Sequence, residues 1–360
     1  MNLRAHVDNL LSALIEWVFR RKSRGLLVMR AGSALLVLLI AGMNLSLTIP
    51  TGSGSFTIGW ADGGISPLLS YGLIALAVVL ILVGLFLVIG EARIEGRKRV
   101  FVIELRGLRD WDGPPLTDDV PASLPGRREP ILLDMRQRIQ DGVIVDPGAA
   151  LKRISSLRSD LELREKGIDR RDFSYVAGGL APVPLTFLVG VVLDDETPIT
   201  FMDWDRHARK WHRLSEPDDL KRFVIDGLDP LPAQVDEVIL AVSASYQVDL
   251  ASARAKLPGC AVVHLLLDGA STSSHLSSEK QIALGRQFLD TCLKLQARGV
   301  KRIHLFLAAP SSLTLRFGTL YDKRNLPLVA VYQYEQGKRQ PFAWAISMPV
   351  AGTSEPSLLS

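Results

Sequence analysis

Two long uncharged stretches near the start of the chain, Ala31 to Ala61 and Gly63 to Gly90, dominate its hydrophobic pattern. Apolar residues run from Leu35 to Ile49 in the first stretch and from Leu68 to Ile89 in the second. Because a bilayer core takes about 20 apolar residues per helix, both stretches are long enough to span a membrane. The pattern predicts a transmembrane hairpin of two helices and leaves open whether it only anchors the protein.

Basic residues flank the predicted hairpin on both outer sides and are missing from its turn. Between the spans, residues 50 to 67 hold no Lys or Arg and a single acidic residue, Asp62. Because Lys and Arg concentrate in cytoplasmic loops, we expect a multi-pass protein with both termini in the cytoplasm. A cleaved signal peptide fits less well, since a second span follows the first. The flanking residues are Arg20, Arg21, Lys22 and Arg24 before the first span, and Arg93, Arg97, Lys98 and Arg99 after the second.

Residues 6 to 18 carry an amphipathic pattern ahead of the first basic cluster. Apolar residues recur at steps of three and four from Val7 to Val18, which places them on one helical face. Such a helix beside basic residues fits a membrane surface that contains anionic lipid. Packing against the soluble region is an equally open alternative. We assign residues 1–25 to an amphipathic, juxtamembrane segment and residues 26–90 to the transmembrane hairpin.

The composition agrees with a membrane protein that carries one large soluble part. The chain is 48% hydrophobic, its sequence pI is about 9.1, and its net charge is +4. This balance is compatible with an anionic ligand but does not require one. Cys260 and Cys292 stand in apolar surroundings without CxxC or Cys/His spacing, as core thiols of a reducing compartment do. We expect no metal site and no cofactor.

The soluble region begins with short strands, helices and a proline-rich connection. Phe101 to Leu105 is predicted to be a strand, and Trp111 to Pro130 a loop or linker. Asp146-Pro147 predicts a helix start, with aspartate as N-cap and proline at the first helical position. Gly167 predicts the end of that helix.

A strand and a hairpin are predicted next. The strand is Phe173 to Ala177, followed by a turn at Gly178-Gly179. The hairpin pairs Leu185 to Leu193 with Ile199 to Trp204.

The rest of the soluble region alternates strands and helices more clearly. Its short apolar runs are typical of buried parallel strands. The succession predicts a Rossmann-like parallel sheet with an antiparallel edge. The predicted elements are strands at Val238–Ala244, Ala261–Leu267 and Arg302–Ala309, a helix from Ser277 or Ser278 to Gly299, a helix from Pro310-Ser311-Ser312, and a hairpin of Leu328–Tyr334 with Phe342–Ser347.

The two halves of the soluble region share a weak internal repeat. Pro184-Leu185 begins a hairpin in the first half and Pro327-Leu328 begins one in the second, each after a strand that ends in small residues. Two related α/β lobes would explain this pattern, and chance similarity between two sheet ends is the alternative. We assign residues 91–145 to a linker and the start of the soluble region, and residues 146–360 to its main domain.

Small and polar residues follow several predicted strands. In parallel α/β sheets, ligands bind beyond the carboxyl ends of the strands. A helix that starts there offers free backbone N–H groups and the positive end of its dipole to an anion. Plain N-capping by serine is the alternative. The candidate ligand-binding residues are Ser243, Ser245, Tyr246, Ser311, Ser312 and Arg316.

No catalytic motif stands out. The patterns GxGxxG, Walker A, HExxH and GxSxG are all missing from the sequence. Asp203 to His207 is the segment richest in reactive groups, but successive side chains at a strand end point to opposite faces, which disfavours a metal site. Trp204 and Arg206 from this segment are further candidates for ligand binding, and a core position for Trp204 is the alternative. We expect that the protein is not an enzyme.

Part of this pattern resembles a known family. Arg302 to Leu313, continuing through Arg316-Phe317-Gly318 to Leu326-Pro327-Leu328-Val329, resembles the C-terminal signature of SAVED domains. The signature is a strand with His-Leu-Phe, two small residues and a proline, then a helix with a glycine, then a hairpin. The resemblance covers about residues 173–348. It implies an α/β fold in which a two-helix transmembrane hairpin precedes a cytosolic SAVED domain of two fused CARF-like Rossmann lobes, here over residues 146–360.

The resemblance also implies a function. SAVED proteins of CBASS antiviral defence bind cyclic oligonucleotides that a CD-NTase enzyme makes after infection. We therefore expect an effector that binds a cyclic di- or trinucleotide and no DNA, oligomerises, and disrupts the bacterial inner membrane to abort phage infection. Arginines and amides would hold phosphates, and flat side chains would hold bases. Small residues that would let the spans of assembled copies approach are Gly32, Gly42, Gly72 and Gly84.

Two other functions stay open at this stage. One is a membrane-anchored nucleotide-processing enzyme with Asp203, Asp205 and His207 in catalytic roles. The other is a CARF-like sensor of a CRISPR system, whose ligand would be a cyclic oligoadenylate rather than a CD-NTase product.

Overall fold

The computed structural model describes most of the chain and divides it into two compact units. The described residues are 23–42, 46–51, 54–59, 67–107, 113–136, 139–140, 143–144, 146–194, 197–205, 208–232, 234–271, 275–352 and 355–359. The units are Met1–Lys98 and Arg99–Ser360. The amphipathic helix expected over residues 6 to 18 lies outside the described residues.

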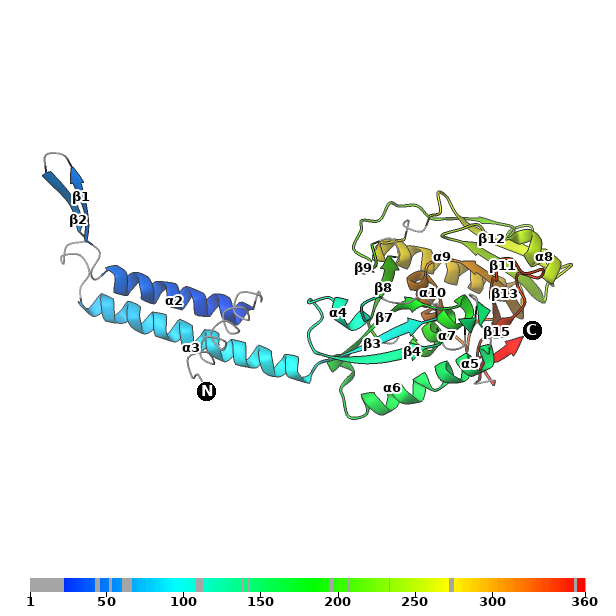
Figure 1. Ribbon diagram of the computed structural model, residues 1–360, viewed down its shortest axis with the longest axis horizontal. Helices are drawn as coiled ribbons and strands as arrows, with labels where there is room; N and C mark the ends of the chain where they lie inside the picture. Colours follow the sequence, from blue (N-terminus) through cyan, green and yellow to red (C-terminus); the bar gives the residue numbers. More distant parts are fainter. Residues whose placement is uncertain are drawn as a thin grey trace. The chain divides into compact units, whose positions relative to one another are not determined.

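The first unit is built on two helices that lie side by side, α2 (Arg24–Gly42) and α3 (Pro67–Arg97) (Figure 1). Ser23 caps α2, since its hydroxyl accepts a hydrogen bond from the Leu26 N–H at 3.1 Å. Within the part of the chain that the structure describes, one helical stretch, Tyr71–Arg93, is long and apolar enough to cross a membrane, with a mean hydropathy of 3.3.

The first predicted span is wrong in its extent. Helix α2 begins at Arg24 and ends at Gly42, and the apolar residues after it form an antiparallel strand pair, β1 (Ser46–Thr51) and β2 (Gly54–Gly59). Threonine and isoleucine favour strands, and Pro50 and the glycines disfavour helix. Hydropathy alone could not separate the helix from the strands.

Glycines bring α2 and α3 into backbone contact. A Cβ atom added to Gly32 would lie 2.8 Å from the Ala77 carbonyl oxygen, and one added to Gly84 would lie 2.6 Å from the Met29 nitrogen. Real Cβ atoms do not approach so closely, so these glycines serve packing within the hairpin. A Cβ on Gly72 would meet nothing within 4 Å.

Within its described residues, the second unit is built mainly on a five-stranded and a seven-stranded sheet. The first has the strand order β4-β3-β7-β8-β9, with parallel pairing except at the antiparallel edge strand β9. The expected strand at residues 101–105 and the expected helix start at Asp146 are confirmed, and the Asp146 side chain accepts a hydrogen bond from the Ala149 N–H at 2.9 Å. The strands are β3 (Arg99–Arg106), β4 (Arg127–Asp134), β7 (Phe173–Leu180), β8 (Ile199–Asp205) and β9 (Lys210–Arg213).

Helices and short elements complete this lobe. The proline-rich connection holds the short helix α4 and the start of β4, so it is more ordered than the loop expected there. Strands β3 and β4 both lie before residue 146, where the main domain was expected to begin. The remaining elements are α4 (Leu116–Asp119), β5 (Ile139–Gln140), β6 (Val143–Ile144), α5 (Pro147–Ser155), α6 (Leu157–Glu165), the 3-10 turn η2 (Arg170–Asp172) and α7 (Val183–Leu193).

Two local predictions in this lobe are wrong. Val183–Leu193 is the helix α7 and not a strand of a hairpin. It is apolar on nearly every side because both lobes cover it, so it carries no helical periodicity to distinguish it from a buried strand. Gly178-Gly179 is no turn but part of β7, where a Cβ on Gly179 would collide with Leu105 of β3.

The second sheet confirms the predicted Rossmann-like pattern. Its order is β10-β12-β11-β13-β14-β15-β16, with parallel pairing from β12 through β14 and antiparallel strands at both edges. Ser277 caps the long helix α9. The elements are β10 (Phe223–Asp226), β11 (Glu237–Ser243), α8 (Leu250–Lys256), β12 (Ala261–Leu267), α9 (Ser278–Ala297), β13 (Arg302–Ala308), α10 (Ser311–Thr319), β14 (Leu328–Tyr332), β15 (Ala345–Ser347) and β16 (Ser357–Leu359).

The internal repeat is present, but in another register than the sequence suggested. Ala181-Pro182-Val-Pro-Leu-Thr-Phe-Leu-Val-Gly190 matches Ala309-Pro310-Ser-Ser-Leu-Thr-Leu-Arg-Phe-Gly318 at five of ten positions with identical spacing. The first segment joins β7 to α7 and the second joins β13 to α10. The pairing of Pro184-Leu185 with Pro327-Leu328 is therefore wrong.

Each of the two repeated helices, α7 and α10, packs against the sheet of the other lobe. Helix α7 contacts β14 and β15 of the second sheet, whereas α10 contacts β7 and β8 of the first. Both helices lie between the strands of the two sheets (Figure 1). One hydrophobic core therefore runs through both lobes and includes Phe187 of α7 and Phe317 of α10.

Candidate functional site

The carboxyl ends of β11 and β13 form one side of a polar rim. The backbone N–H groups of Ala244 and Ser245 donate to the Ala308 carbonyl at 2.9 and 3.0 Å, so the two strand ends lie side by side. Helix α10 begins three residues later, at Ser311. Tyr246 projects from this rim with 66% of its surface exposed.

Ser243 and Ser245 are less available than the sequence suggested. Ser243 is fully buried, and its hydroxyl lies 2.9 Å from His264 Nε2 and accepts the Val248 N–H at 3.0 Å. Burial lowers the pKa of His264, which favours the neutral ring. Ser243 therefore has a structural role at the end of β11, and the Ser245 side chain is buried as well.

The first sheet extends the rim with groups that the sequence reasoning missed. The Met135 N–H donates to the Arg106 carbonyl at 2.7 Å, and the Gly107 N–H to the Leu180 carbonyl at 2.6 Å. Arg106 pairs with Glu104, and Arg136 pairs with Asp134, each at 2.5 Å. Hydrogen bonding from Arg136 outweighs burial and lowers the pKa of Asp134. The sequence carried a signal for both, since Arg106 is the last residue of β3 and Arg136 stands two residues after β4.

One hydrogen bond joins the rims of the two sheets. The Val183 N–H, at the start of α7, donates to the Gln333 side-chain oxygen at 2.9 Å. Gln333 follows β14, and its neighbour Tyr334 is 47% exposed. The carboxyl ends of both sheets therefore meet along a single edge, which we call the carboxyl rim.

Ser312 faces away from this rim and into a buried cluster between the lobes. Its hydroxyl donates to Asp203 Oδ2 at 2.8 Å and accepts from Gln281 Nε2 at 2.8 Å. His275 Nε2 lies 2.8 Å from the same Asp203 oxygen. Asp203 comes from β8 of the first lobe, whereas the other three residues belong to the second, so the cluster ties the lobes together.

Arg316 lies near this cluster and not at the carboxyl rim. Its Nε donates to Gln281 Oε1 at 3.3 Å, its NH2 group lies 3.5 Å from Ser278 Oγ, and its guanidinium carbon stands 4.7 Å from the centre of the Phe201 ring. Burial lowers the pKa of Arg316 to about 10, so the side chain stays charged at neutral pH. Ser311 alone of the α10 candidates remains at the rim.

Trp204 takes the core position that was the alternative for it. Its ring packs edge-on against Trp211 with 5.3 Å between centroids, in the cluster that contains Val100 and Met202. Arg206 and His207 lie outside the described residues. Among the residues that are described, no group of three His, Cys, Asp or Glu side chains is placed to hold a metal ion.

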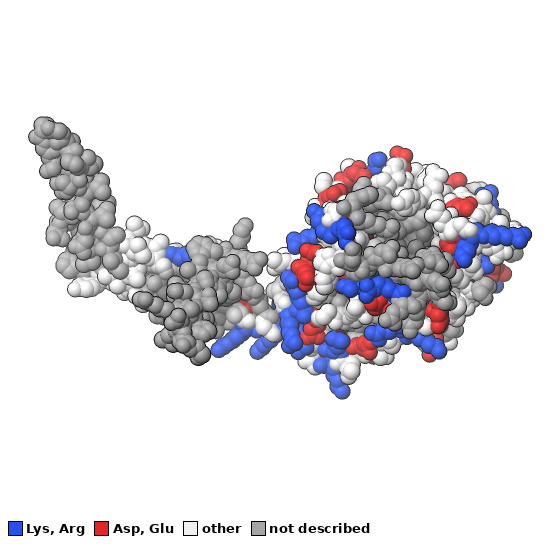
Figure 2. All heavy atoms as spheres, in the orientation of Figure 1, with Lys and Arg blue, Asp and Glu red and all other residues white. Residues whose placement is uncertain are grey.

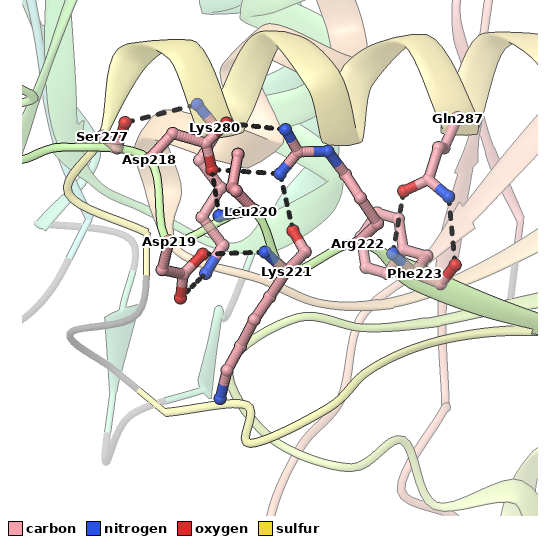
Figure 3. Close-up of polar contacts among 9 residues, drawn as sticks. All are labelled: Asp218, Asp219, Leu220, Lys221, Arg222, Phe223, Ser277, Lys280 and Gln287. Atoms are coloured by element: carbon pink, nitrogen blue, oxygen red, sulfur yellow. Dashed lines mark hydrogen bonds and ion pairs between the residues drawn. The ribbon is translucent and has the colours of Figure 1, made fainter.

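The segment that connects the lobes is fastened along α9 (Figure 3). Buried Lys280 pairs with Asp219 at 2.7 Å, and Arg222 pairs with Asp218 at 2.6 Å. The Gln287 amide accepts the Phe223 N–H at 2.8 Å and donates to the Phe223 carbonyl at 3.0 Å. The contacts of Lys280 and Gln287 hold this segment against the amino-terminal half of α9, which carries Gln281.

Comparison with known families agrees with this architecture. A family model described as SMODS-associated and fused to various effectors sensor domain, SAVED, matches residues 158–348. A second, described as SAVED-fused 2TM effector domain, matches residues 4–151. The fold and the rim define a two-lobed α/β sensor domain joined to a membrane part. The chain belongs to the SAVED family, in its form fused to a 2TM effector domain.

Solved structures of similar proteins include two Cap4 SAVED/CARF-domain containing receptors. That from Acinetobacter baumannii, with the cyclic trinucleotide 2′3′3′-cAAA, has 12% sequence identity and a TM-score of 0.49, and the match covers 78% of this chain and 60% of that one. That from Moraxella osloensis has 11% identity and a TM-score of 0.47, covering 78% and 59%. The chain thus spans about 60% of the length of these receptors. No curated protein matches the sequence.

Proposed function

We propose that this protein is a CBASS effector whose sensor domain binds a cyclic oligonucleotide made by a CD-NTase enzyme. Binding brings copies together, and the assembled membrane hairpins disrupt the bacterial inner membrane and abort phage infection. The protein is a multi-pass protein with both termini in the cytoplasm, needs no cofactor, and is not an enzyme. Membership of the SAVED family with a fused 2TM effector domain supports this proposal.

The reciprocal crossing of α7 and α10 carries the proposal. A Cβ on Gly190 would collide with the Leu315 carbonyl, and a Cβ on Gly318 would collide with the Phe187 carbonyl. Phe187 and Leu315 are themselves equivalent in the repeat, and contacts that reciprocate in this way are the mark of a two-fold relation. A cyclic oligonucleotide repeats phosphate and base around its ring, so a rim with two related strand–helix units suits it.

The carboxyl rim supplies the groups that such a ligand needs. The first turn of α10 offers backbone N–H groups and a helix dipole to a phosphate. Exposed Tyr246 and Tyr334 offer flat faces for bases. Arg106 at the end of β3 and Arg136 just after β4 add guanidinium groups. The face drawn in Figure 2 intersperses basic and acidic residues over the Arg99–Ser360 unit.

Assembly of several copies would bring their membrane hairpins together and increase the disturbance of the bilayer. Within the described part of α3, large apolar side chains such as Leu82 and Phe86 are 58% and 77% exposed, as for residues facing lipid or a neighbouring helix. Gly32 and Gly84 are already used within the hairpin, whereas Gly72 leaves room for a second copy. Holding many hairpins together on stacked sensor domains raises their effective concentration and favours such contacts.

The test is a titration of the full-length protein in detergent with cyclic di-, tri- and tetranucleotides, following both affinity and particle size. We expect at least one member to bind and to enlarge the particle. Tyr246→Ala should weaken binding about tenfold, since stacking on one base contributes about 1–3 kcal/mol, and Tyr246→Phe should retain it. Failure of every member to bind would refute the sensor function.

The same protein samples distinguish the proposed sensor from an enzyme and from a sensor of a CRISPR system. An enzyme would convert the bound cyclic oligonucleotide, and loss of that turnover in Asp203→Ala would contradict the non-enzymatic proposal. A sensor of a CRISPR system would respond to cyclic oligoadenylates and not to products of a CD-NTase.

A further inference from the structure

A cavity of about 280 Å³ lies between the lobes, away from the carboxyl rim. Its walls come from the start of β8 in the first lobe and from α9 and α10 in the second. Ile199, the first residue of β8, lines it, so it lies at the amino-terminal end of that parallel strand. The rim, in contrast, gathers the carboxyl ends of the strands.

Arg316 lines this cavity and is a largely buried cation without an acidic partner. Its guanidinium contacts neutral groups: the Gln281 side-chain oxygen, the Ser278 hydroxyl and the face of Phe201. Among the described residues, no carboxylate lies within ion-pair distance of its guanidinium. Taking a charge out of water is costly unless a counter-charge compensates it. The protein therefore retains a desolvated positive charge beside an open space.

Arg286 adds a second positive charge to the same cavity. It stands on α9, is exposed, and forms no ion pair within the described part of the chain. The other cations along this side of α9 differ, since Lys280 and Arg222 are paired with Asp219 and Asp218 (Figure 3). Among the described residues, Arg286 and Arg316, which both line the cavity, have no ion-pair partner.

The other residues that line the cavity indicate which kind of ligand would fit it. Thr197 and Thr319 add hydroxyl groups, and Ile282 and Leu289 form an apolar wall. The Thr319 hydroxyl already donates to the Arg316 carbonyl at 2.9 Å. The two guanidinium groups and the Thr197 hydroxyl still offer more donors than the two oxygens of a carboxylate can accept, and they suit the oxygens of a phosphate. The apolar wall suits a flat or aliphatic body attached to that phosphate.

We propose that the cavity lined by Arg286 and Arg316 binds a phosphomonoester on a small flat or apolar body, at a site separate from the carboxyl rim. Because its walls come from both lobes, the bound molecule bridges them. The proposal goes beyond the sensor function and does not depend on it.

The experiment titrates the full-length protein in detergent with inorganic phosphate and with adenosine 5′-monophosphate. We expect saturable binding of both, with the nucleotide bound more tightly because its body contacts the apolar wall. Arg286→Gln should weaken nucleotide binding about tenfold or more, because a charge-assisted contact is lost. Leu289→Trp, which fills the cavity without changing its charge, should do the same. Arg254→Gln, at an exposed arginine of α8, is the matched control and should change nothing.

Two results would overturn the proposal. One is the absence of saturable binding, or equal binding by all these variants. The other is nucleotide binding that survives Arg286→Gln but is lost in Tyr246→Ala, which would put the nucleotide at the rim. Cyclic oligonucleotide binding is measured separately on the same samples, so failure of the sensor function and failure of this site are distinguishable.

Discussion

Gly190 of α7 and Gly318 of α10 touch each other at equivalent positions of the internal repeat. A Cβ added to Gly190 would lie 2.8 Å from the Gly318 Cα, and one added to Gly318 would lie 2.9 Å from the Gly190 Cα. The two crossover helices are therefore in backbone contact at the centre of the shared core. No residue other than glycine fits at either position without moving a helix.

Gly190→Ala or Gly318→Ala should accordingly destabilise the sensor unit by about 3 kcal/mol or more, because overpacking here meets backbone and not a flexible side chain. Thermal unfolding of the full-length variants measures this. Gly148→Ala is the matched control, since its Cβ would meet Asp146 Oδ1 at an ordinary 3.5 Å and alanine favours the helix α5. Equal melting temperatures for all three variants would contradict the crossing.

Asp203→Ala should weaken the contact between the two lobes and lower the stability of the protein. The substitution leaves two buried partners, the His275 ring nitrogen and the Ser312 hydroxyl, without their acceptor. Each unpaired buried polar group costs about 1–3 kcal/mol, so we expect a loss of about 2–4 kcal/mol in denaturant unfolding. Asp290→Ala, at an exposed position on α9, should be neutral. A neutral Asp203→Ala would mean that the cluster does not hold the lobes together.

The Lys280–Asp219 pair predicts a pH-dependent contribution to stability. Burial raises the pKa of Asp219, but hydrogen bonds from Lys280 and from the Lys221 N–H outweigh it, and the pKa is lowered overall. A carboxyl whose pKa is lower in the folded state stabilises the fold above its unfolded-state pKa of about 3.9, and this stability is lost as the pH falls through the folded-state pKa.

Asp219→Asn should therefore cost about 1 kcal/mol at pH 7, a modest value because Asp219 is 43% exposed. The difference in melting temperature from the wild type should shrink below about pH 4. Asp290→Asn is the control and should show no such trend. A difference that stays constant with pH would show that Asp219 acts other than through its charge.

The topology of the membrane hairpin can be tested with reporter fusions. The basic flanks and the Lys- and Arg-free turn predict that both ends of the hairpin lie in the cytoplasm. Alkaline phosphatase inserted between Gly52 and Ser53 should be active, and the same enzyme fused after Ser360 should be inactive. The reverse pattern, or equal activity in both fusions, would contradict the proposed orientation.

The sequence predicts an element of the fold correctly where one physical signal dominates the local pattern. Asp146-Pro147 predicts a helix start because capping is local, and the apolar runs at residues 238–244 and 261–267 predict buried parallel strands because both faces are covered. Helix α7 was missed for the converse reason, since a helix buried on all sides has no polar face. The strand pair β1–β2 was missed because hydropathy does not distinguish a strand from a membrane helix.

The candidate site was predictable in position but not in orientation. Strand-end reasoning correctly placed Tyr246 and Ser311 at the carboxyl rim. Strand-end reasoning could not predict that Ser312 contacts Asp203 and that Arg316 contacts Phe201. These contacts depend on how α10 packs against the first lobe. The packing of α10 follows from the internal repeat, and the sequence pattern predicts that repeat in the wrong register because it predicts a strand where α7 lies.

The most direct test of the account is dye leakage from liposomes that contain the full-length protein. Adding the cyclic oligonucleotide that binds should release the dye, and Tyr246→Ala should require about tenfold more ligand, whereas Tyr246→Phe should behave as the wild type. Binding of the ligand without any release of dye would contradict the claim that the membrane hairpin is the output of the sensor.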